Sequence, residues 1–109
     1  MAYDEDLAAR IRERMADEPG LTERKMFGGI GWMLDGNMAV GAGSKGSLML
    51  RVDPKRGHEL VGDHVEPMHM NGRSMNGWLL VDRAVLDDDD RLHEYMQHGI
   101  DYARSLPPK

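Results

Sequence analysis

The stretch at residues 23–33 constrains the fold more than any other part of the chain, because large apolar side chains lie there beside unusually free backbone. It holds the only phenylalanine, Phe27, one of the two tryptophans, Trp32, and three of the thirteen glycines. Glycine permits backbone angles and close approaches that a Cβ atom forbids, so Gly28-Gly29 predicts a tight turn or bulge where a sheet changes direction. The stretch therefore predicts a strand, a sharp bend and a second strand.

Turn residues and apolar runs predict further antiparallel strands around this bend. The Asp-Gly-Asn sequence at residues 35–37 is a strong hairpin signal. Pro67 indicates that its own segment is an edge strand or irregular, because proline cannot donate a hydrogen bond within a sheet. The predicted strands span residues 22–27, 30–35, 37–41, 47–52, 65–70 and 74–82.

Three helices complete the predicted order. An amphipathic pattern predicts the first over residues 4–17. Asp53-Pro54 is typical of a helix start and predicts a short helix to about Val61. The four aspartates at 87–90 precede an apolar stripe and are expected to begin the last helix. The order is helix, three or four strands, helix, two strands and helix. It predicts a single α+β domain over residues 1–109, with two layers and an antiparallel sheet of about five to six strands.

Composition narrows the compartment and the class of partner. Cysteine is absent, which excludes disulfides and thiolate chemistry, and ten methionines are expected to fill much of the core. The net charge of −5 disfavours binding to a phosphate backbone. An acidic start and the lack of a long apolar run favour a cytoplasmic protein without a membrane partner. The methionines expected in the core include Met26, Met33, Met38, Met49, Met75 and Met96.

No arrangement of residues points to a catalytic, cofactor or metal site. The glycines at 28–31 could hold a phosphate only between a strand and a helix, whereas a second strand follows them here. His64 and His69 are five positions apart, as are His93 and His98, which is not the spacing of two ligands on one helix face. No serine lies in a nucleophile elbow. We therefore expect no catalytic residue, no cofactor and no metal.

Several motifs resemble those of the TfoX/Sxy N-terminal domain family. They are Glu23-Arg24-Lys25-Met26-Phe27-Gly28-Gly29-Ile30-Gly31, Gly36-Asn37-Met38, Leu50-Arg51-Val52, Pro67-Met68, Gly77-Trp78 and the ending Ala103-Arg104-Ser105-Leu106-Pro107-Pro108-Lys109. The resemblance covers almost the whole chain. It implies a secretion-chaperone-like α+β fold with helices packed on an antiparallel sheet, and a tendency to form dimers. Full-length regulators of the family also have a C-terminal helix-hairpin-helix domain, which has no counterpart in residues 1–109.

The sequence thus predicts a non-enzymatic regulatory module that acts through protein contacts, as a homodimer or with another protein. The residues expected at its interaction surface are Lys25, Met26, Phe27, Gly28, Gly29, Trp32 and Trp78. Two alternatives stay open. A local basic patch could bind nucleic acid, and its members would be Arg10, Arg14, Arg24, Lys25, Arg51 and Arg73. An enzymatic pocket could join Glu23 or Lys25 to His64 or His69.

Overall fold

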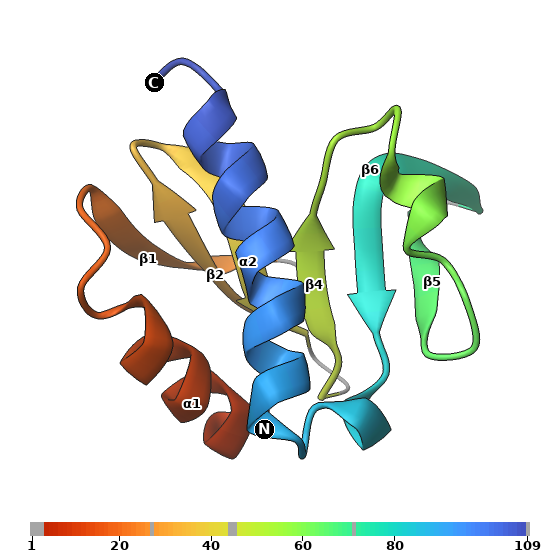
Figure 1. The fold of residues 1–109 in the computed structure, drawn as a ribbon, viewed down its shortest axis with the longest axis horizontal. Coiled ribbons are helices and arrows are strands. Elements are labelled where there is room, and N and C mark those ends of the chain that lie inside the picture. Colours follow the sequence, from red (N-terminus) through yellow and green to blue (C-terminus); the bar gives the residue numbers. More distant parts are fainter. Residues whose placement is uncertain (1–3, 27, 44–45, 71, 109) are drawn as a thin grey trace.

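The computed structural model describes residues 4–26, 28–43, 46–70 and 72–108, and it shows two α-helices on a six-stranded antiparallel sheet (Figure 1). The helices are α1 (Glu5–Met15) and α2 (Asp89–Ser105), with two 3-10 helices, η1 (Gly57–Glu59) and η2 (Arg83–Val85). The strands are β1 (Leu21–Met26), β2 (Gly29–Leu34), β3 (Asn37–Ala42), β4 (Leu48–Arg51), β5 (Val65–Met70) and β6 (Arg73–Val81). The predicted α+β fold and the order of its elements are confirmed.

The first four strands form a meander, and the last two form a hairpin in which β6, not β5, pairs with β4. The order is β1-β2-β3-β4-β6-β5, so β1 and β5 are the two edges. Pro67 therefore lies in an edge strand, as predicted, and the register shifts between Pro67 and His69. In the β2–β3 turn, Asp35 and Gly36 have φ angles of 53° and 85°. Positive φ at both positions is the hairpin geometry that an Asp-Gly turn favours.

The glycine-rich bend is the turn of the β1–β2 hairpin. Gly28 has a φ of 74°, and Gly29 begins β2. A Cβ atom on Gly29 would lie 2.0 Å from the backbone oxygen of Ala42, so this position has no room for a side chain. A strand precedes the glycines and a strand follows them, as predicted. Phe27 lies outside the described residues.

The segment after Asp53 contains less helix than predicted. Asp53 Oδ1 accepts a 2.9 Å hydrogen bond from the Lys55 backbone N–H, as a helix cap would, but only η1 follows. Within residues 54–61, Gly57 is buried and Leu60 is half-buried, and the other six residues are exposed. Helix nucleation is costly in a short segment, glycine lowers the helix propensity further, and little apolar burial offsets either cost. The prediction of an α-helix reaching Val61 is therefore wrong.

The aspartates at 87–90 lead into α2, as predicted. The Asp88 carboxylate caps the helix by accepting hydrogen bonds from the backbone N–H groups of Asp90 at 2.9 Å and Arg91 at 3.4 Å. Figure 1 shows α2 lying over the middle of the sheet. Gly99 permits this approach, because a Cβ atom there would lie 2.3 Å from the backbone oxygen of Ala39.

Both helices cover the same face of the sheet. Leu7 and Ile11 of α1 belong to one buried cluster with Leu92 and Met96 of α2. Leu50 of β4 lies in the same cluster. This helix-side core holds the two layers together, and within the described residues the opposite face of the sheet has no helix over it.

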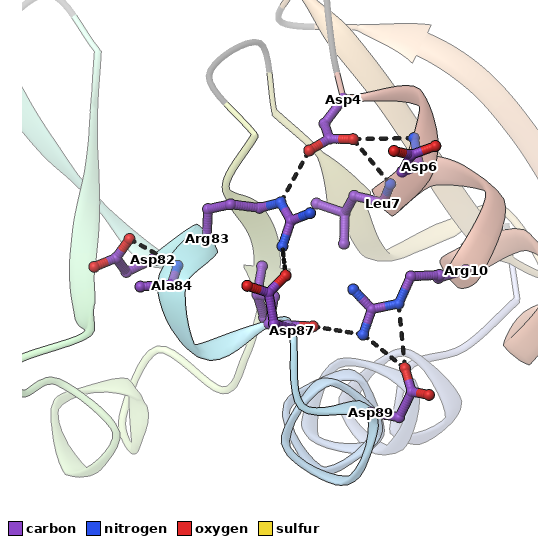
Figure 2. A network of polar contacts seen from close by, with 10 residues as sticks. Asp4, Asp6, Leu7, Arg10, Asp82, Arg83, Ala84, Asp87 and Asp89 are labelled. Carbon is purple, nitrogen blue, oxygen red and sulfur yellow. Dashed lines mark hydrogen bonds and ion pairs between the residues drawn. The ribbon is translucent and has the colours of Figure 1, made fainter.

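Ion pairs join the start of α1 to the segment that precedes α2 (Figure 2). Arg83 donates to Asp4 Oδ2 at 2.9 Å and also to the Asp87 carboxylate. Arg10 donates to Asp89 Oδ1 at 2.7 Å. The bond from Arg83 is the main reason why the pKa of Asp4 lies below its ordinary value. Because Asp4 also caps α1, one carboxylate orders the helix and attaches it to the rest of the fold.

The other end of α2 is fixed in the same manner. Arg104 donates to Glu18 Oε1 at 3.0 Å and to Asp35 Oδ2 at 3.3 Å. Asn37 is buried, and its Nδ2 donates a 2.9 Å hydrogen bond to the backbone oxygen of Pro107. These contacts attach the end of α2 to the α1–β1 loop and to the β2–β3 turn.

Candidate interaction surface

Trp32, one of the predicted contact residues, is a core residue. Its side chain is 0% exposed and belongs to the helix-side core. Its indole Nε1 donates a 2.9 Å hydrogen bond to Glu23 Oε1, which also accepts from Arg12 Nε at 2.8 Å. The bond from Arg12 is the main reason why the pKa of Glu23 lies below its ordinary value. The three side chains join α1 to β1 and β2, so their contacts stabilise the fold.

The other predicted contact residues do not form a single patch. Lys25 is exposed on β1 and Gly28 is exposed in the adjacent turn, whereas Gly29 is buried. The side chain of Met26 is not among those described. Trp78 is half-buried on β6, three strands away from the β1–β2 hairpin in the sheet order. The residues that surround Trp78, however, form a surface that no pattern in the sequence predicted.

That surface is the face of the sheet opposite the helices. Side chains alternate along a strand, and on β4 Leu48 and Leu50 point to the helix-side core while Met49 points the other way. On β6, Leu79 points to that core and Trp78 points away from it. We name this second apolar cluster the methionine face, and its members are Met33, Met38, Met49, Met68, Met75, Trp78 and Leu80.

Methionine side chains fill the centre of the methionine face. Met49 is 1% exposed, and Met38 is 5% exposed. A Cβ atom on Gly41 would lie 2.6 Å from Met49 Cε and 3.0 Å from Met38 Cε, so both methyl groups lie over this glycine. Around this centre Met33 and Met75 are half-buried, as are the tryptophan and the leucine of the face. The methionine face is therefore packed at its centre and partly open to solvent at its periphery.

Arg51 lies at one end of the methionine face. Its Cζ atom is 5.6 Å from the centroid of the Trp78 ring and 5.6 Å from that of the Tyr102 ring. Both distances are within the range of cation–π attraction. Tyr102 belongs to α2, so this arginine connects the methionine face to the helix layer.

The basic residues of the nucleic-acid alternative are spread over the molecule. Arg10 and Arg14 lie on α1, and polar groups of α2 accept hydrogen bonds from both. Arg24 and Lys25 are exposed on β1. Arg73 is exposed at the start of β6. The structure therefore does not bring the six residues together into one basic patch.

The four residues of the enzymatic alternative lie at opposite edges of the sheet. Glu23 and Lys25 belong to β1, whereas His69 belongs to β5 and His64 immediately precedes it. Five strand spacings separate these edges, or about 24 Å. A hollow of about 520 Å³ lies between α2 and residues 53–60, and none of the four residues lines it. In the part of the chain that the structure describes, no three His, Cys, Asp or Glu side chains are grouped so that they could hold a metal ion.

Comparison with known protein families matched residues 13–103 to the TfoX N-terminal domain. No curated protein and no solved structure matched the chain. The matched residues include all six strands, and with them the whole methionine face. Across the described residues, no helix combines the length and the apolar character that a membrane span needs.

Proposed function

Since the chain belongs to the TfoX N-terminal domain family, a family of competence-regulator domains, we propose that it is a non-enzymatic module that acts through protein contacts in the cytoplasm. The methionine face is the observation that supports this proposal. We propose further that the partner on this face is a second copy of the chain.

An antiparallel sheet with one face in water normally carries polar side chains on that face. Here the face opposite the helices carries five methionines, a tryptophan and a leucine. Methionine is flexible and polarisable, so it adapts to the shape of a partner, and methionine and aromatic residues are enriched in protein interfaces. Covering the half-buried members would remove their apolar atoms from water, which favours association.

Methyl-resolved NMR tests the proposal with controls inside the same molecule. With 13C-labelled methionine methyl groups, a dilution series of the full chain should shift the signals of Met33 and Met75. The signals of Met15 and Met96 should stay constant, because both residues are buried in the helix-side core. If the signals of the methionine face are unaffected by concentration up to the solubility limit, the proposal is refuted.

A pair of leucine substitutions gives the matched control. Leu80 and Leu106 are both half-buried, but Leu80 belongs to the methionine face and Leu106 lies at the end of α2. Leu80→Glu should shift the protein to the monomer in sedimentation equilibrium, whereas Leu106→Glu should leave association unchanged. Equal effects of the two substitutions would argue against the methionine face as the interface.

A further inference from the structure

We infer that the second copy is related to the first by a two-fold axis that runs parallel to the strands, so that Arg24 of each copy faces Glu66 of the other. The inference rests on the proposed function, because it specifies how a partner occupies the methionine face. It follows from the charges at the two ends of a single row of residues.

Three rows of directly paired residues cross all six strands of the sheet, and one of them starts at Arg24. In sheet order it consists of Arg24, Gly31, Gly41, Met49, Leu80 and Glu66. Directly paired residues point to the same face of a sheet, and Met49 and Leu80 belong to the methionine face. The row therefore lies on that face, and its ends are separated by about 24 Å, which is five strand spacings.

The two ends of the row carry opposite charges. Arg24 is exposed on β1, and Glu66 is exposed on β5. Neither side chain makes a hydrogen bond or an ion pair with another described residue. The four residues between them carry no charge, so one copy presents a positive end, an apolar centre and a negative end.

When two sheets stack face to face with their strands aligned, a two-fold axis can relate them in either of two perpendicular directions. An axis along the row places Arg24 over Arg24 of the other copy and Glu66 over Glu66, and like charges repel. An axis parallel to the strands, above the gap between β3 and β4, reverses the row. It places Arg24 over Glu66 twice, once on each side of the axis, as a self-complementary interface requires.

Arg51 does not oppose the arrangement, and Arg73, two residues before Met75, lies off the row at the start of β6. Arg51 lies at the end of β4, and its guanidinium is held against the rings of Trp78 and Tyr102. The attractive pairs of the stacked copies therefore lie at the two edges of the sheet, where β1 of one copy lies above β5 of the other.

Charge reversal tests whether Arg24 of one copy faces Glu66 of the other. In sedimentation equilibrium below about 0.1 M salt, where the Debye length exceeds about 10 Å, Arg24→Glu or Glu66→Arg alone should weaken the dimer about tenfold or more. Each single variant then contains two pairs of like charges. The double variant, Arg24→Glu with Glu66→Arg, restores two attractive pairs and should return to within about threefold of the parent.

An equimolar mixture of the two single variants makes the test sharper. One variant carries Glu at both ends of the row and the other carries Arg at both ends, so the mixed dimer has two attractive pairs. The mixture should associate about as tightly as the parent, although each variant alone does not. Arg91→Glu and Glu94→Arg, exposed on α2, make the same changes in net charge away from the methionine face and should have little effect.

The outcomes separate this inference from the proposed function. If neither the double variant nor the mixture recovers association, while Leu80→Glu abolishes it, the methionine face is the interface and the inferred axis is wrong. If the parent chain is monomeric and its methionine signals do not depend on concentration, the proposed function and this inference fail together.

Discussion

Replacing Gly99 with alanine tests how closely α2 lies on the sheet. A Cβ atom at this position would lie 2.3 Å from the backbone oxygen of Ala39 and 2.9 Å from Leu50 Cδ1. Alanine is favoured over glycine in a helix by about 1 kcal/mol, whereas an extra methyl group in a packed core costs about 1–3 kcal/mol. The oxygen belongs to the backbone of β3 and cannot turn aside. The cost should therefore lie at the upper end of its range, about 2–3 kcal/mol, which leaves a net loss of about 1–2 kcal/mol in the free energy of unfolding.

Urea unfolding followed by circular dichroism measures this loss directly. In thermal unfolding the midpoint should fall by about 4–8 °C for each kcal/mol. His98→Ala is the matched control, because this exposed neighbour on α2 gains helix propensity without approaching β3. If Gly99→Ala is as stable as the parent, or more stable, helix propensity outweighs the contact and α2 does not lie as close to β3 as described.

Three further substitutions test the polar contacts and the methionine face. Asp4→Asn keeps the capping oxygen of α1 but removes the charge that Arg83 binds. Because that bond holds the pKa of Asp4 below its ordinary value of 3.8, the carboxylate stabilises the fold above this pH, and its contribution is lost as the pH falls through the lower folded pKa. In urea unfolding the variant should be less stable than the parent at pH 7, by a margin that shrinks towards about pH 2; a constant margin would contradict the reasoning. Glu23→Gln removes the ion pair with Arg12 and should cost about 0.5–1 kcal/mol in the same assay, so an unchanged midpoint would count against this contact. Gly41→Ala places a Cβ atom 2.6 Å from the Met49 methyl group, which can move aside, and 2.9 Å from the backbone oxygen of Ile30, whereas the corresponding backbone contact at Gly99 is 2.3 Å. It should therefore shift methyl signals of the methionine face while costing less stability than the change in α2; unshifted signals would contradict the packing described.

Local signals in the sequence were sufficient to predict most of the helices, strands and turns of the fold. The Asp-Gly turn at 35–36, the bend at Gly28 and the aspartates at 87–90 each act over a few residues, so their geometry depends little on distant contacts. The segment after Asp53 shows where local signals fail. Its cap forms, but whether a helix continues depends on burial against other elements, and those contacts are not local.

The candidate surface was harder to predict, because it depends on which face of the sheet the helices cover. Alternation places Met49 and Leu50 on opposite faces without indicating which face is open to a partner. Trp32 resembled a contact residue because large aromatic side chains are common at interfaces. It is buried instead, with Arg12 of α1 over its ring and Glu23 accepting a hydrogen bond from its N–H group. The row from Arg24 to Glu66 required the pairing of β4 with β6, which brings together residues that are distant in the sequence.

The contacts that hold α1 in place also bear on the order in which the chain can fold. Arg83 and Asp4 are separated by 79 positions, as are Arg10 and Asp89, and Arg104 is 86 positions from Glu18. In the meander from β1 to β4, each strand pairs with the next strand along the chain. The loops that must close are therefore short and cost little entropy, which favours early formation of the meander. During synthesis α1 is made well before Arg83 and Asp89, the long-range ion-pair partners of Asp4 and Arg10. We expect pulse-labelled amide exchange to find the meander protected before α1, so that this helix, although made before the sheet, is among the last elements to become stable.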